Sequence, residues 1–561
     1  MELRTLIDQW IEEKLELQIN QFDYSKQTII EIGQMIESMF SSGLFMLGNS
    51  YLSVLELIIH KLKSKEYKVA VERAEAISYY QLFEVAVDYY HLRDYIYYSY
   101  AKENSIEWQK NGEDIYVRVH DKSIFRQLVH NSQILFLNSS KMLKDNVMSM
   151  ENILLALKNQ EEFDFNNEKI TDVLNSIEQE TKIKMKSFFS YIPFDSEISF
   201  GKYTYCEFIA VYTELLENSL YRRYYSYANN LSSVIVYEGI ELSSAISQVL
   251  QIEQEKIVYI LMDISRSSRG TFIYIEQDNI FIMYLTSFSL LDGITNMLKY
   301  YANTNSNGFL TNFAEPIGQA LVDSLEQSFI QFKNFRCIKE KKLNKYSQLL
   351  PDIDLLALSY EPSLGFHAYV CEVKNGLIPI WAKDYLKALG KKGYLEKALS
   401  QITCIEEFFN TNVGQEMLYE SIMEKFSFLD FEKLFPRGFC VLVEFLIVTS
   451  ENIGVLCEDC NKSIVSASII KEIIEKSDGD VTYIQECLSK LNETMDSCLE
   501  VKCKETILNG IKVKYEVCSS NALLKFDDNY FLSCGMDKEI EENALETGYS
   551  FIDGFVDEIS S

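Results

Sequence analysis

The feature that most constrains the fold of this chain is a pair of strand-forming runs, residues 353–358 and 366–373. Both runs are apolar and rich in residues that favour strands, and a short turn separates them. Charged residues stand at one end of each run: Asp354 opens the first, and Glu372 and Lys374 close the second. We therefore expect a buried-looking pair of strands that carries acidic and basic groups at one end.

The elements around this pair follow one another in the order helix, strand, strand, strand, helix, strand. Pro316 falls in the first turn of the first helix, where proline is tolerated. The predicted elements are a helix over 315–331, strands over 335–338, 353–358 and 366–373, a helix over 384–408 and a strand over 440–448. Residues 409–439 are interpreted as an insertion before the last strand.

The remainder of the chain is divided by pattern into regions of different kind. In the first region, Leu3, Ile7, Trp10 and Leu17 are expected on one helical stripe. The second region has a strand pattern over 115–120 and a hairpin pattern over 271–284, and the polar run 303–308 is the best linker candidate. A second hairpin turns at Asn509-Gly510. The predicted domains are a helical region (1–110), a mixed α/β region of unknown role (111–305), an α/β core (309–460) and a small α+β region with an acidic tail (461–561).

The length, the hydrophobic share and the net charge of the chain limit the class of protein to which it can belong. With 561 residues, 47% of them hydrophobic, the chain can bury several cores. Its net charge of −30 argues against unspecific binding of polyanions by the whole surface. The N-terminus lacks a secretory signal pattern, and the apolar run 440–448 is too short to cross a bilayer, so no membrane partner and a cytoplasmic location are expected.

The charged residues of the strand pair predict a metal site. Side chains alternate along a strand, so Glu372 and Lys374 share one face, and Asp354 on a neighbouring strand can converge with Glu372. Two carboxylates with open positions suit Mg²⁺ or Mn²⁺, which would lower the pKa of a water and neutralise charge on a phosphodiester. Lys374 can orient that water or stabilise the transition state. The alternative is an exposed ion pair of little energetic value, because Glu-x-Lys is a common tripeptide.

With these motifs, residues 309–450 resemble the PD-(D/E)XK nuclease superfamily, the restriction-endonuclease-like fold, and most closely its Mrr-like and NERD-like branches. The match is Pro351-Asp352 or Asp354, then Glu372-Val-Lys374. The resemblance implies a mixed central sheet flanked by helices, Asp354 and Glu372 as metal ligands, and Asp352 as an alternative ligand. It also implies a Glu on the first core helix, for which Glu315 fits best and Glu326 is the alternative. Gln401 fits the Gln that is frequent on the helix after the lysine.

The expected fold class is therefore α+β and multidomain, with a helix-rich N-terminal region before the nuclease-like core. The resemblance implies a Mg²⁺-dependent DNA endonuclease, and by analogy a nuclease joined to a long unassigned module resembles bacterial anti-phage defence effectors. The main alternative is a non-catalytic nuclease-fold scaffold that binds nucleic acid or a protein partner, with a homo-oligomer left open. A junction resolvase or recombination nuclease is a weaker third reading.

Local charge favours contact with a phosphate backbone. Residues 333–397 hold 12 Lys or Arg and 7 Asp or Glu, in contrast to the acidic whole. The expected DNA contacts are Lys333, Arg336, Lys339, Lys341, Lys342, Lys345, Lys383, Lys387, Lys391 and Lys392. A solvated helix face would have the same composition, so the lysines do not decide between the two.

A zinc site is the remaining metal hypothesis. Cys457-Glu-Asp-Cys460 has ligand spacing, and Cys440, Cys498 or Cys503 could join it. Because a second Cys-x-x-Cys is missing, unliganded thiols are the favoured interpretation.

Overall fold

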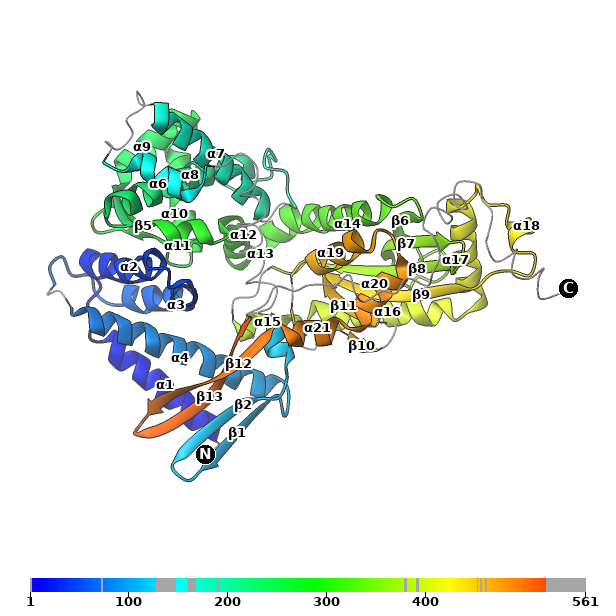
Figure 1. The fold of residues 1–561 in the computed structure, drawn as a ribbon, viewed down its shortest axis with the longest axis horizontal. Coiled ribbons are helices and arrows are strands. Elements are labelled where there is room, and N and C mark those ends of the chain that lie inside the picture. The colour runs from blue at the N-terminus through cyan, green and yellow to red at the C-terminus, as the bar shows by residue number, and fades with distance from the viewer. Residues whose placement is uncertain are drawn as a thin grey trace. The chain divides into compact units, whose positions relative to one another are not determined.

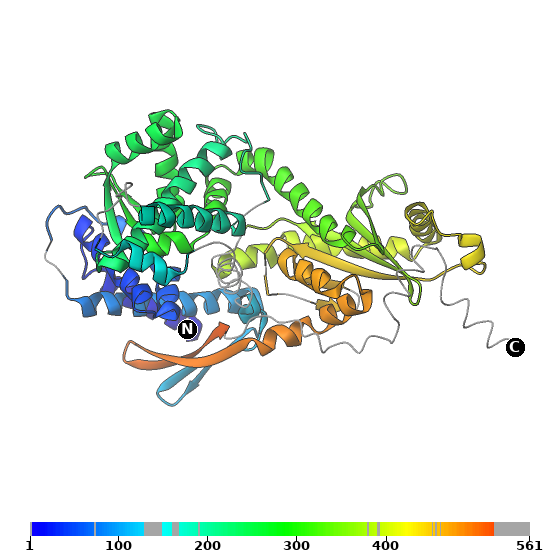
Figure 2. The same cartoon turned by 45° about the horizontal axis from the view of Figure 1, so that its top comes forward.

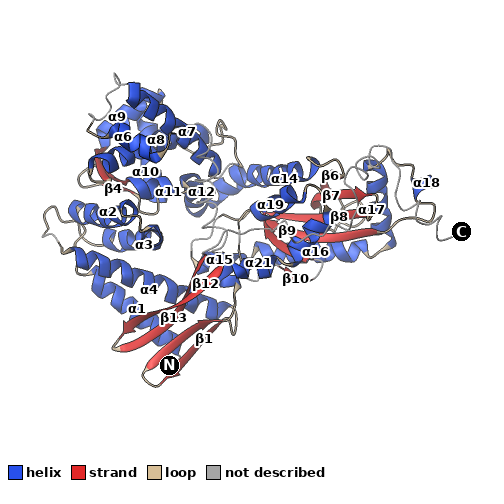
Figure 3. Cartoon of the chain, viewed as in Figure 1, coloured by secondary structure: helices blue, strands red, loops and turns tan. Residues whose placement is uncertain are grey.

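The computed structural model describes residues 3–71, 74–127, 148–159, 168–188, 191–377, 381–389, 393–451, 453–454, 457–459 and 462–520 (Figure 1). These residues form a mixed α+β protein, which confirms the coarse fold class (Figure 3). The chain divides into two compact units. The described residues within 1–120, 132–315 and 502–517 form the first, and those within 121–131, 316–501 and 518–561 form the second.

Helices dominate the first unit. Its helices are α1 (Leu3–Ile19), α2 (Lys26–Ser41), α3 (Phe45–Lys63), α4 (Ala76–Ala101), α6 (Met150–Leu157), α7 (Glu168–Ser187), α8 (Tyr205–Asn229), α9 (Gly239–Leu250), α10 (Gln254–Ser267), α11 (Leu285–Leu290), α12 (Gly293–Thr304), α13 (Ser306–Phe309) and the π-helix η2 (Leu310–Ala314). In α1 the buried stripe is Ile7, Ile11, Leu15 and Ile19, whereas Leu17 is 69% exposed. The predicted stripe was therefore wrong at Leu17, because every fourth residue faces the neighbouring helices.

The predicted linker over 303–308 was also wrong. Residues 303 and 304 end α12, and Ser306 begins α13. The Asn305 side chain accepts a 3.1 Å hydrogen bond from the Gly308 amide, which begins the next helical turn. Asparagine and serine favoured a helix cap here rather than an open connection.

Two sheets belong to the first unit. One has the strand order β1-β2-β13-β12 and the other β3-β5-β4. Their strands are β1 (Ile106–Asn111), β2 (Asp114–Val119), β3 (Val234–Glu238), β4 (Phe272–Ile275), β5 (Ile280–Tyr284), β12 (Leu499–Leu508) and β13 (Ile511–Ser520). Both predicted hairpins are present, and Asn509 and Gly510 take φ values of 48° and 77°, as a tight hairpin turn requires. The second hairpin joins the first part of the chain, because β13 pairs in parallel with β2.

A six-stranded sheet with the order β10-β11-β9-β8-β7-β6 forms the centre of the second unit. Its strands are β6 (Phe335–Lys341), β7 (Ile353–Glu361), β8 (Gly365–Lys374), β9 (Val441–Thr449), β10 (Cys457–Asp459) and β11 (Lys462–Ser466). β6, β7 and β8 are antiparallel neighbours, and β9 runs parallel to β8. The predicted order of helix, three strands, helix and strand is confirmed.

Helices cover both faces of this sheet (Figure 2). The helices of the second unit are α14 (Glu315–Ile330), α15 (Ala382–Leu389), α16 (Tyr394–Phe409), α17 (Asn412–Lys425), α18 (Phe431–Leu434), α19 (Ala467–Ser477), α20 (Val481–Ser489) and α21 (Leu491–Ser497). The long helix expected over 384–408 is two helices, and Gly393 is the N-cap of the second. α16 and α17 share a hydrophobic core with Leu356 and Val370 on one face. On the other face Phe329 of α14 contacts Tyr369, with ring centroids 5.7 Å apart.

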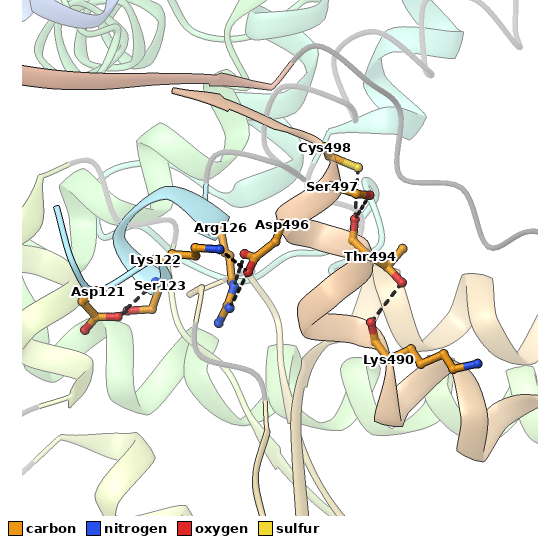
Figure 4. Close-up of polar contacts among 9 residues, drawn as sticks. All are labelled: Asp121, Lys122, Ser123, Arg126, Lys490, Thr494, Asp496, Ser497 and Cys498. Carbon is orange, nitrogen blue, oxygen red and sulfur yellow. Dashed lines mark hydrogen bonds and ion pairs between the residues drawn. The ribbon is translucent and has the colours of Figure 1, made fainter. Parts of the chain in front are cut away.

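A short helical segment, residues 123–127, belongs to the second unit although it follows β2 (Figure 4). Arg126 binds both carboxylate oxygens of Asp496 at 2.7 and 3.0 Å, and Lys122 lies 3.1 Å from the same group. Gly454, with φ of 74°, approaches Ser123 so closely that an added Cβ would lie 2.1 Å from its carbonyl oxygen. This bidentate pair and the close backbone contact anchor the segment to the second unit.

No helix in the described part of the chain is both long and apolar enough to span a membrane.

Candidate metal centre

The register of β7 and β8 brings Asp354 and Glu372 together. Leu355 pairs with Cys371 across these antiparallel strands, so the next position places Asp354 opposite Glu372. Asp354 Oδ2 accepts a 2.7 Å hydrogen bond from the Val373 amide. Side chains on directly opposite residues lie about 5 Å apart at Cβ, so the two carboxylates share one small space.

Lys374 completes the group from the same face of β8. Its Nζ contacts Glu372 Oε1 in a close ion pair. Glu372 is 1% exposed and the Lys374 side chain is 18% exposed, so the pair lies at the edge of the core rather than on an open strand. The ion pair between Glu372 and Lys374 that was the alternative to a metal site is therefore present, but it is largely buried rather than solvated.

Glu372 Oε2 is a buried carboxylate oxygen without a hydrogen-bond partner among the described residues. Burial and the neighbouring charge of Asp354 raise the pKa of Glu372 to about 7, although Lys374 and Lys397 act in the opposite direction. Burial also raises the pKa of Asp354, against the hydrogen bond from Val373 and the charge of Lys374. An unpaired buried acceptor costs free energy that a bound cation would recover.

The chain after β8 is held beside the site by Ser450. The Ser450 amide donates to the Lys374 carbonyl at 3.1 Å, and Ser450 Oγ accepts from the Gly376 amide at 2.8 Å. The same hydroxyl donates to the Gly376 carbonyl at 2.5 Å. Because β9 lies parallel to β8, these bonds fix the carboxyl ends of both strands next to Glu372.

α16 stands over the carboxylates on the same face of the sheet. Its Ala398 and Ile402 pack in the core that contains Val370. Val370 lies two residues before Glu372 on β8, so the two side chains share one face of the strand. Gln401 Oε1 is buried and has no hydrogen-bond partner within the described part of the chain. Lys397, four residues earlier on the helix, acts electrostatically on Glu372.

The other acidic candidates are placed differently. Asp352 accepts hydrogen bonds from Lys342 Nζ at 2.9 Å and from the Leu343 amide at 3.2 Å, so it holds the connection between β6 and β7. Glu326 pairs with Lys339 at 3.0 Å. Glu315 is exposed at the first residue of α14 and is assigned to the first unit.

Several of the predicted DNA-contacting residues are engaged within the chain. Lys339 pairs with Asp323 at 2.7 Å, and Lys341 donates to Ser421 at 2.9 Å. The Arg336 guanidinium lies 5.8 Å from the ring centres of Phe426 and Phe428. Lys342 is bound to Asp352, Lys345 lies over the Tyr346 ring, and Lys387 is 4.0 Å from Asp384. Lys333 and Lys383 are exposed. Lys391 and Lys392 lie outside the described residues.

Among the described residues, His, Cys, Asp and Glu side chains do not gather in a group of three or more that could hold a metal. A cation at Asp354 and Glu372 would therefore take its other ligands from water, backbone or substrate, as Mg²⁺ commonly does. Cys440 and Cys503 are exposed and Cys498 is buried, and none of the three forms a disulfide with another described residue. Cys460 and the side chain of Cys457 lie outside the described residues, so the zinc hypothesis stays a prediction.

Sequence reasoning missed Lys397 and Ser450. A signal for Lys397 was present, since it precedes Gln401 by one helical turn and so shares its flank of the helix. Ser450 gave no such signal, because its role depends on β9 lying beside β8. Comparison with family models, curated proteins and solved structures finds no match to this chain.

Proposed function

We propose that the second unit is a Mg²⁺- or Mn²⁺-dependent nuclease that hydrolyses phosphodiester bonds of DNA. The observation that carries this proposal is the unpaired, buried Glu372 Oε2 beside Asp354, with Lys374 on the same strand face. The antiparallel β6, β7 and β8, followed by a parallel β9, support a restriction-endonuclease-like core.

Asp354 and Glu372 would hold the cation, because both offer carboxylate oxygens and Glu372 Oε2 has no protein donor among the described residues. The bound cation would supply charge neutralisation at the phosphate and a water of lowered pKa. Lys374, whose ammonium already lies at this place, is positioned to donate to a phosphate oxygen and to stabilise the charge that develops there. Gln401, with its buried free oxygen, would orient a water through that acceptor.

The test is cleavage of plasmid DNA by the full chain with Mg²⁺, with Mn²⁺ and with EDTA. We expect cutting with either metal, none with EDTA, and loss of cutting in Lys374→Ala and Glu372→Gln. Lys476→Ala is a matched control, since it removes a lysine of α19 that pairs with Glu472. Cutting that survives both site variants would contradict the proposal.

A non-catalytic scaffold is the second candidate, and one observation favours it. Many of the basic residues near the site are already bound within the chain, and the net charge is −30. DNA binding by the wild type without cutting in either metal would support this candidate. Parallel assays with RNA would decide which nucleic acid is the substrate.

On the analogy of a nuclease joined to a long additional module, we propose a role in anti-phage defence. The first unit would then recognise the signal or recruit a partner. Protection of a bacterial host from phage, lost in Glu372→Gln, would support this role.

A further inference from the structure

Lys397 differs from the other cations near the carboxylates. It is exposed near the start of α16, and no side-chain hydrogen bond or ion pair engages it within the described residues. Lys374, Lys342 and Lys339, by contrast, each contact a carboxylate. The Lys397 ammonium group is therefore unpaired as far as the described part of the chain goes.

The position of Lys397 is set by the packing of α16. Its neighbour Ala398 is fully buried in the core with Val370 and Ile402, which fixes this turn of the helix over β8. Lys397 and Gln401 lie four residues apart, so they share the flank of the helix at the edge of that core. The charge of Lys397 is felt at Glu372, but less strongly than that of Lys374. Lys374 contacts Glu372 directly, whereas Lys397 stands on the helix that packs over this face of the sheet.

We propose that Lys397 binds a nonbridging oxygen of the phosphate next to the one that is cleaved. This inference rests on the proposed nuclease function and adds a substrate-binding residue to it. Lys374 occupies the space at the carboxylates, so the cleaved phosphate would meet Lys374 first. A nucleic-acid backbone carries its next phosphate one nucleotide away, where an exposed and unpaired ammonium can neutralise it.

Cleavage kinetics and DNA-binding measurements on Lys397 variants test whether Lys397 binds a flanking phosphate. In Lys397→Ala we expect KM for DNA to rise about tenfold with little change in kcat, because the contact is to a flanking phosphate. In EDTA, the slope of log Kd against log salt should fall in magnitude by about 1, the value for one lost phosphate contact. Lys397→Arg should restore most of the affinity, and Lys476→Ala should change neither quantity.

Each other outcome overturns the inference. If Lys397 only tunes the proton affinity of Glu372, Lys397→Ala will shift the pH–rate profile and leave the salt slope unchanged. A fall in kcat with unchanged KM would place Lys397 at the cleaved phosphate instead. If the wild type cuts DNA and Lys397→Ala behaves like it, the inference fails and the nuclease function stands. If the wild type neither cuts nor binds nucleic acid, both fail. If the wild type binds DNA without cutting it and Lys397→Ala leaves the salt slope unchanged, the inference fails as well.

Discussion

Asp354 and Glu372 face each other across β7 and β8, and Asp354 is held there by a 2.7 Å hydrogen bond from the amide of Val373, the residue after Glu372. The bond ties one carboxylate to the strand of the other. Two acids are thereby kept close in a place where burial disfavours the charge of both. Such an arrangement costs stability unless a cation balances it.

The first prediction concerns stability in the absence of metal. The pKa of Glu372 is about 7 in the folded chain, against about 4.3 for an unfolded glutamate, so the folded state binds the extra proton between these values. The free energy of unfolding should therefore fall as pH rises from 5 to 8. Glu372→Gln removes the titrating carboxyl group and with it this loss of stability. Relative to wild type, the free energy of unfolding of the variant should therefore rise by roughly 2–3 kcal/mol between pH 5 and pH 8. Urea unfolding in EDTA at several pH values measures this, and parallel pH profiles for the two proteins would contradict it.

The second prediction separates Asp354 from Asp352. Asp354→Asn should lose more than about 100-fold in cleavage, because losing a ligand exceeds the 10–100-fold cost of losing a residue that supports one. It should also abolish the rise in melting temperature that we expect Mg²⁺ to give the wild type by binding the folded state. Asp352→Asn loses only the solvent-screened ion pair with the exposed Lys342, so it should retain both responses. The reverse pattern would make Asp352 the ligand.

The third prediction concerns the segment anchored by Arg126 and Asp496. Gly454→Ala places a Cβ 2.1 Å from the Ser123 carbonyl oxygen at φ of 74°, so it should lower the free energy of unfolding by more than about 2 kcal/mol. Gly438 has a similar φ of 84° with open space around its Cβ position. Gly438→Ala should therefore lower the free energy of unfolding by the backbone strain alone, about 1 kcal/mol. Equal losses of stability in the two variants would show that the contact with Ser123 contributes nothing.

The order of elements in the second unit could be predicted because it depends on local patterns. Alternation of side chains along residues 366–373 places Glu372 and Lys374 on one face whatever the partner strands are. Tight turns are equally local, and Asn509-Gly510 adopts the positive φ values that its residue types favour. Prediction failed at the exposed Leu17, where the neighbouring helices decide which face is buried, and at residues 303–308, where Asn305 caps a helix instead of opening a connection.

The sequence by itself therefore determined the strands, the hairpins and the presence of Asp354, Glu372 and Lys374 at strand ends, because backbone alternation and turn geometry act over a few residues. Only the tertiary structure decided that Asp354 lies opposite Glu372, that Asp352 is bound by Lys342, and that Lys397 on α16 lies near the carboxylates. It also decided that β13 returns to pair with β2. These relationships join residues that are far apart in the chain, and they depend on the register and packing of whole elements, which no short stretch of sequence encodes.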